Sequence, residues 1–149
     1  MRKSIYEKII SAQKREITEY HIYLKLAKSF SGERARILSE IAEQEKNHYR
    51  ILKSISGKEI APSDFLLFFY PFLSKILGLN FTLQLMERGE ELSIKFYNSL
   101  SKDEKELANL IKIIDDEREH ERKLISMIEE KKLAYIGDFV LGINDALIE

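Results

Sequence analysis

Apolar residues recur in steps of three and four along four long stretches of the chain, which is the spacing of helices that bury one face. The stretches cover about residues 4–30, 33–55, 79–100 and 101–131. Gly32 and Gly57, each preceded by a serine, follow the first two stretches and are typical of helix ends. Ser101 and Glu104 form a capping-box pattern at the start of the fourth stretch. The pattern predicts four amphipathic helices.

The connections between these helices predict how they are arranged. Short turns join the first helix to the second and the third to the fourth, so each pair should be antiparallel. Residues 58–78 join the two pairs and contain an apolar run, 65–73, after a Ser63-Asp64 helix-start signal. We expect a crossover helix there, packed on the bundle or in a dimer contact, or else lying in a membrane interface. The predicted fold is all-α, a four-helix bundle with a long crossover helix and a short C-terminal segment.

The composition narrows the chemistry that such a bundle can perform. The chain has 149 residues, enough for one domain with a single core. Its 24 Lys plus Arg residues balance 25 Asp plus Glu residues, so it lacks the basic surface that nucleic-acid binding requires, and nucleic acid is not an expected partner. It has no cysteine, which excludes disulfides, thiolate zinc sites and iron–sulfur clusters. Any metal must therefore be held by Glu, Asp or His.

Two features of the sequence concern location in the cell. The N-terminal residues are charged and lack the apolar region of a secretory signal, so we expect a cytoplasmic chain. No apolar run is long enough to cross a bilayer as a helix, and Pro71 and Lys75 interrupt the crossover run. The chain as given is therefore not expected to span a membrane.

The two halves of the sequence repeat the same polar residues. Glu45, His48, Glu16 and Tyr23 of the first half correspond to Glu117, His120, Glu90 and Tyr97 of the second. The offset between the two Glu-x-x-His motifs is nearly the same as the offset between the two Glu-to-Tyr spacings. An internal duplication related by a pseudo-two-fold axis would place these side chains at one depth in the bundle.

Four of these residues, Glu16, Glu45, Glu90 and Glu117, interrupt apolar stripes that otherwise face the core. A buried, unpaired carboxylate is expensive, and four converging ones repel each other. Two divalent cations would balance four carboxylates, and the imidazole one turn from Glu in each motif would add a ligand. Oxygen ligands with some imidazole suit iron or manganese, with zinc possible on ligand type. The alternative is ordinary polar residues at helix edges, with a buried Glu–His hydrogen bond in each half.

These residues resemble the metal-binding pattern of the ferritin-like di-iron carboxylate family, most closely its rubrerythrin-type domains. The matching positions are Glu16, Tyr23, Glu45, His48, Glu87, Glu90, Glu117 and His120. The resemblance covers residues 1–132 as one ferritin-like bundle. It implies that Glu45 and Glu117 bridge two iron ions, that Glu16 and either Glu87 or Glu90 are terminal ligands, and that the two histidines complete the site. The duplication favours Glu90 as the primary ligand in the third helix.

The resemblance also implies a function. A domain of this kind captures Fe(II) and oxidises it with O2 or peroxide. This chain lacks the four-cysteine iron site of a complete rubrerythrin, so a self-contained peroxidase relay is not expected. A metal-sensing regulatory module without oxidation and a structural dimerisation bundle remain as alternatives.

Residues 133–149 form a tail with a second resemblance. Its Gly137-Asp138 and Gly142-x-Asn144-Asp145 runs are similar to the opening of the membrane domain of the vacuolar iron transporter family. This implies a cytosolic ferritin-like domain that serves iron or manganese transport or detoxification beside a membrane domain. Alternatively, the tail packs on the bundle or on a partner subunit. Exposed apolar residues of the crossover and tail predict a homodimer.

Overall fold

The computed structural model of the protein describes residues 3–86, 95, 112–120 and 122–127. Three complete helices lie within these residues: α1 (Lys3–Ala27), α2 (Gly32–Ser56) and α3 (Asp64–Leu77). Residues 79–86, 112–120 and 122–127 are also helical. The described part of the chain contains no strand, so it is all-helical as predicted. No helix among the described residues is long and apolar enough to cross a membrane.

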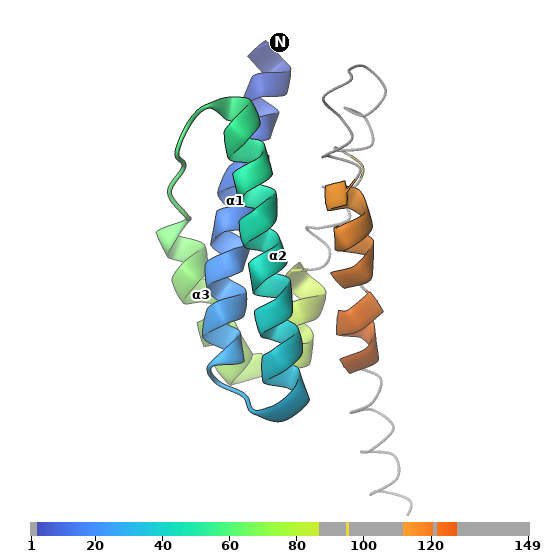
Figure 1. Cartoon of the computed structure of the whole chain (residues 1–149). Coiled ribbons are helices and arrows are strands. Elements are labelled where there is room, and N and C mark those ends of the chain that lie inside the picture. Colours follow the sequence, from blue (N-terminus) through green and yellow to red (C-terminus); the bar gives the residue numbers. More distant parts are fainter. Residues whose placement is uncertain (1–2, 87–94, 96–111, 121, 128–149) are drawn as a thin grey trace, which may run out of the picture.

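The first two helices form an antiparallel hairpin (Figure 1). Their bounds confirm the predicted stretches to within about three residues at either end, a normal uncertainty for helix termini. Gly57 ends α2 in a left-handed conformation with φ of 67°, and its backbone N–H donates to the Lys53 carbonyl at 2.9 Å. A residue with a Cβ rarely adopts this φ, so the Ser56-Gly57 signal has a direct physical basis.

The crossover helix is present as α3 and packs on α1 (Figure 1). Ser63 precedes it, but its side chain makes no capping bond; its backbone N–H donates instead to Thr18 Oγ1 at 2.9 Å. Pro71 lies inside α3 and has no N–H for the carbonyl of Leu67. The Lys25 ammonium on α1 donates to that carbonyl at 3.1 Å. Because Pro71 leaves the Leu67 carbonyl without its helical hydrogen bond, this carbonyl can accept the bond from Lys25 that connects α3 to α1.

The predicted third and fourth helices are described in part. Residues 79–86 belong to the third, and residues 112–120 and 122–127 to the fourth; all of these are helical. The remainder of both helices, the Ser101 capping box and the tail 133–149 lie outside the described residues. Residues 112–120 and 122–127 run beside the α1–α2 hairpin, because Ile113 and Leu124 share core clusters with it.

The buried interior consists of two apolar clusters with a polar layer between them. One cluster, toward the α1–α2 turn, includes Ile22, Leu38, Ile41, Leu83 and Leu124. The other, toward the opposite end of the hairpin, comprises Ile9, Ala12, Leu52, Ile113 and Ile114. On α1, on α2 and on residues 112–120 and 122–127 alike, the buried acids and histidines stand between members of these two clusters. The bundle thus holds a charged layer in a dry environment.

Candidate metal centre

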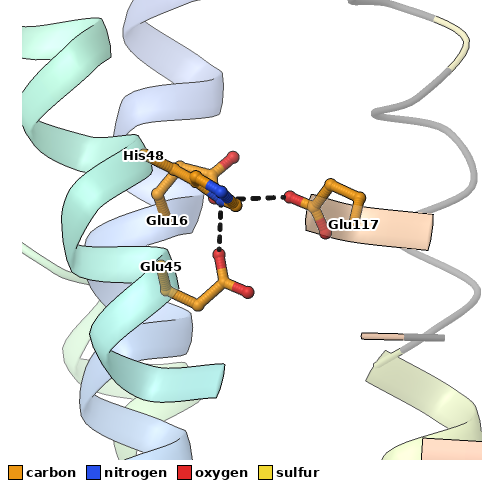
Figure 2. Close-up of side chains that lie close together, drawn as sticks. All are labelled: Glu16, Glu45, His48 and Glu117. Atoms are coloured by element: carbon orange, nitrogen blue, oxygen red, sulfur yellow. Dashed lines mark ion pairs between the residues drawn. The ribbon is translucent and has the colours of Figure 1, made fainter. Parts of the chain in front are cut away.

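Three carboxylates and two imidazoles meet in this layer. Glu16 comes from α1, Glu45 and His48 from α2, and Glu117 and His120 from residues 112–120. All five are at most 1 % exposed. One ligand atom from each of Glu16, Glu45, His48 and Glu117 lies within 4.8 Å of the others, an arrangement that could hold a metal ion. Figure 2 shows these four side chains converging from the hairpin and from the facing helix.

Helical spacing explains why each element contributes its side chains at this depth. The three-residue interval from Glu45 to His48 brings both to one face of α2, one turn apart. The same interval does so for Glu117 and His120. These pairs continue the apolar faces of their helices, so packing of the flanking apolar residues places them inside.

His48 is surrounded by the three carboxylates. Its Nδ1 lies 3.3 Å from Glu45 Oε2, 3.5 Å from Glu16 Oε2 and 3.5 Å from Glu117 Oε1 (Figure 2). His120 Nδ1 lies 3.0 Å from Glu45 Oε1 and 3.8 Å from Glu117 Oε2. None of these contacts has the geometry of a normal hydrogen bond, and within the described residues both oxygens of Glu45 and Glu117 have no hydrogen-bond partner. Buried acceptors of this kind call for a cation or a proton.

The far ring nitrogens of both histidines are held by residues that the sequence analysis missed. His48 Nε2 lies 3.1 Å from Asp116 Oδ2, and His120 Nε2 lies 2.6 Å from Gln44 Oε1. If Nε2 donates to these oxygens, Nδ1, which faces the carboxylates, is the nitrogen that would bind a metal ion once it carries no proton. That is the arrangement of a metal-binding imidazole, whose other nitrogen donates to an oxygen that orients the ring.

These two bonds cross between the halves of the molecule. Asp116 precedes Glu117 and bonds His48, while Gln44 precedes Glu45 and bonds His120. Gln44 and Asp116 are therefore related by the same offset as the two Glu-x-x-His motifs. Comparison of the residues that precede the two Glu-x-x-His motifs would have identified both Gln44 and Asp116 as repeated polar positions, although not their hydrogen-bond partners.

Arg15 on α1 places its guanidinium against one acid of the layer. Its Nη2 lies 2.9 Å from Glu16 Oε1, and its Nε lies 3.6 Å from Glu19 Oε2. Burial tends to raise the pKa of Glu16, but the Arg15 charge and the His48 contact outweigh burial and hold the pKa well below its usual value. Glu16 is therefore ionised at neutral pH.

The pKa values of the other four side chains of the layer are shifted in different directions. Burial raises the pKa of Glu45 to about 8 and that of Glu117 to about 7. Burial lowers the pKa of His120 to about 4. Burial also opposes the charge on His48, but its contacts with Glu117, Glu16 and Glu45 outweigh burial and raise its pKa above the ordinary value. Without a cation, the layer reduces its charge repulsion by binding protons.

We expect the metal-free protein to lose stability between pH 6.5 and 8. Because the pKa values of Glu45 and Glu117 are raised on folding, protonation of each stabilises the folded protein fully below pH 4.5. This stabilisation is lost as the pH rises to about 8 for Glu45 and to about 7 for Glu117. The pKa of His48 is also raised, so its stabilisation of the folded protein decreases above pH 6.5. The lowered pKa of His120 does not change stability in this range, because the ring is neutral in both the folded and the unfolded state. Urea unfolding of chelator-treated protein should show a loss of roughly 1–4 kcal/mol, because each of the three groups contributes up to about 1.4 kcal/mol per pH unit. Equal or greater stability at pH 8 would contradict these assignments.

The structure thus brings together five of the seven predicted ligands: Glu16, Glu45, His48, Glu117 and His120. Glu87 and Glu90, and with them Tyr97, lie outside the described residues. Tyr23 is fully buried on α1. The alternative of polar residues at helix edges with a buried Glu–His hydrogen bond in each half agrees with the described residues in burial alone, because neither Glu–His pair has hydrogen-bond geometry. The five side chains are buried, and the hydrogen bonds of the histidines run to Asp116 and Gln44.

No protein-family model, no curated protein and no solved structure matches the chain.

Proposed function

We propose that this chain is a ferritin-like, dinuclear iron-binding domain that captures Fe(II) and oxidises it with O2 or peroxide. The observation that carries the proposal is the buried layer of Glu16, Glu45, His48, Glu117 and His120, in which carboxylate oxygens and imidazole Nδ1 atoms face one another. Positive charge between the acids would offset the cost of burying their ionised forms.

The donor set fits iron. Carboxylate oxygens with neutral imidazole nitrogens suit Fe(II) and Mn(II), and zinc accepts the same ligands. Three acids are present among the described residues, and the proposed helix-three ligand, Glu87 or Glu90, would supply a fourth. Two divalent ions would then balance the carboxylates. Glu45 and Glu117, each of which lies close to both histidines, would be the residues that both ions share.

The proposed arrangement accounts for the duplicated sequence. Each half would contribute a terminal acid from one helix and a Glu-x-x-His pair from the next, as in ferritin-like bundles with inward-facing ligands. The crossed Asp116–His48 and Gln44–His120 bonds support a pseudo-two-fold relation between the halves.

The chemistry assigns separate roles to the metal substrate and to the protein. Two Fe(II) ions supply two electrons, which with two protons reduce O2 to hydrogen peroxide, or peroxide to two waters. The protein holds the ions with buried carboxylates, orients the imidazoles through Asp116 and Gln44, and excludes bulk water with the apolar clusters on either side. Glu45 and Glu117, whose pKa values lie near neutrality without metal, release protons when a cation replaces those protons.

The test is stopped-flow absorbance after the Fe(II)-loaded protein is mixed with O2 or with peroxide. An oxidation rate well above that of free Fe(II) supports the proposal. Reversible iron binding without accelerated oxidation would favour a metal sensor. Absence of bound metal after purification and after added iron would favour a structural bundle. If metal content survives the double substitution of Glu45→Ala and Glu117→Ala, the site assignment is wrong.

The role in transport is a further part of the proposal and rests on the 133–149 tail alone. We propose that the domain serves an iron or manganese transporter at the cytoplasmic face of a membrane. The natural reading frame tests this directly. Hydrophobic spans that continue after Glu149 support the role, whereas a stop codon after Glu149 contradicts a covalent fusion.

Replacing Asp116 by alanine should weaken metal binding about 10–100-fold, the usual effect of removing an outer partner of a histidine ligand. Asp116 bonds His48 Nε2 at 3.1 Å and so fixes the ring. Asp115→Ala is the matched control, because Asp115 is exposed and pairs only loosely with Arg118, at 3.7 Å. Competition with a chromogenic chelator measures both affinities. Equal effects of the two substitutions would show that Asp116 does not position His48.

A further inference from the structure

One side of α3 is apolar and exposed. The α3 stripe, as we call it, consists of Phe65, Phe68, Phe72 and Ile76, which are 68 %, 69 %, 48 % and 61 % exposed. Steps of three and four residues align the four side chains along the helix. The rings of Phe68 and Phe72 stack with centroids 5.6 Å apart. The other side of α3 packs on the core through Leu66, Leu67 and Tyr70. A contiguous apolar stripe of this kind on a folded surface marks an interaction site.

The only charged residues of α3 stand at its two ends. Asp64 begins the helix and Lys75 lies in its last turn, and both are exposed or half-exposed. Their separation along the chain is close to three full turns, so they share one edge of the stripe. Phe65 and Ile76 have the same separation and share the other edge. The stripe thus carries opposite charges at opposite ends of one edge.

We propose that the α3 stripe docks against the α3 stripe of a second copy of this chain, with the two helices antiparallel about a two-fold axis. In a two-fold contact every pair of residues occurs twice, so the surface must complement itself when reversed. Reversal about residue 70 brings Phe68 onto Phe72, Phe65 onto Ile76 and Asp64 onto Lys75 of the second copy. Three pairs share this centre to within half a residue.

The surface beside the stripe has room for the partner's side chains. A hollow of about 370 Å³ lies against Phe68 and Phe72, and Lys25, Leu67 and Pro71 also line it. An aromatic side chain of the second copy can enter it. With about 150–250 Å² per aromatic side chain, the exposed parts of the stripe amount to roughly 500 Å². That is somewhat over half of the roughly 800 Å² that each partner gives to a standard interface, so we expect a weak, concentration-dependent dimer.

A second copy fits this face better than a lipid surface. Helices that lie in a membrane interface carry several Lys or Arg residues on a polar face. α3 carries one base and one acid, and Asp64 on the edge of the stripe would face anionic headgroups. A reversed copy places Lys75 at that position instead.

Sedimentation velocity of the full chain, from about 1 to 200 µM, tests the dimer. We expect a concentration-dependent dimer, with a dissociation constant at least about tenfold higher for Phe68→Glu. Ile125→Glu is the control, since Ile125 is an exposed apolar residue on residues 122–127, away from the stripe. The measurement is made on metal-free and on metal-loaded protein, because the proposed dimer does not depend on the metal site. A chain that stays monomeric throughout overturns the proposal.

Charge reversal tests the antiparallel pairing itself. Asp64→Lys or Lys75→Asp alone should weaken the dimer several-fold, because each places like charges opposite one another. The double variant should recover the wild-type dissociation constant. A double variant as weak as the single ones overturns the pairing. Binding to vesicles with anionic lipid tests the membrane alternative. If the chain stays monomeric and binds such vesicles, and Phe68→Glu removes this binding, the stripe contacts membrane and not a second copy.

Discussion

Replacing Glu45 by glutamine is expected to abolish most metal binding and at the same time to stabilise the metal-free protein. Glu45 lies 3.3 Å from His48 Nδ1 and 3.0 Å from His120 Nδ1, so it is the acid with the closest contacts to both imidazoles. Loss of a direct ligand should weaken binding by more than about 100-fold, since even an outer partner contributes 10–100-fold.

The gain in stability has the same origin as the loss of binding. Burial raises the pKa of Glu45 to about 8, so its ionised form is unfavourable in the metal-free layer. A neutral amide of the same size removes that charge. At pH 8 the free energy of unfolding should rise by about 1–3 kcal/mol, because one pKa unit corresponds to about 1.4 kcal/mol. Urea unfolding of chelator-treated protein measures this gain, and metal analysis by mass spectrometry measures the loss.

Glu43→Gln is the control for both effects. Glu43 is on the same helix, but its side chain is 64 % exposed and its contact with Lys46 is 4.0 Å long. It should change neither metal content nor stability by a measurable amount. A Glu45→Gln protein that keeps its metal would refute the assigned site. One that loses both metal and stability would show that Glu45 has a structural role instead.

Adding metal to the metal-free protein should raise its melting temperature by about 8–16 °C. A ligand that binds only the folded state, at 1,000 times its dissociation constant, stabilises by about 4 kcal/mol, and a chain of this length gains about 2–4 °C per kcal/mol. Mn(II) and Zn(II) are suitable probes because they undergo no oxidation under these conditions. Calorimetry with and without excess chelator measures the shift.

The same titration on Glu45→Gln separates binding at the layer from binding elsewhere. We expect this variant's shift to fall to at most about 3–6 °C, because binding weakened by more than about 100-fold leaves at most about 1.4 kcal/mol of stabilisation at the same metal concentration. A wild-type protein that melts at the same temperature with and without metal would mean that no metal binds to the folded state at this site. A shift that persists undiminished in the variant would place the metal on other residues.

Local spacing predicted the helical hairpin because each signal is contained in a few neighbouring residues. The apolar period placed Leu38, Ile41 and Leu52 inside, and the glycine after Ser56 ended α2 where its left-handed φ permits. The interruption of the stripes by Glu16, Glu45 and Glu117 also predicted the buried acids. A carboxylate within an otherwise apolar helix face indicates a specific role, since burying the charge of a carboxylate is costly.

Contacts between segments far apart in the chain could not be predicted in this way. Nothing local to Asp116 indicates that it bonds His48, in the other half of the sequence, because that partner depends on the rotation of two facing helices. The phenylalanines of α3 posed the opposite difficulty. Their pattern equally suits a core face and an exposed one, and only the packing of the other side of α3 on α1 shows which it is.

The layer of acids joins parts of the chain that are far apart in sequence. Glu45 and Glu117 belong to opposite halves of the chain, and a cation between them would close the long loop that separates them. In a chain without cysteine, such an ion acts as a cross-link of the folded state, because it fastens residues 112–120 to the hairpin. Unlike a disulfide, this cross-link opens when the ion leaves. Resistance of the folded protein to proteolysis would then follow the supply of metal.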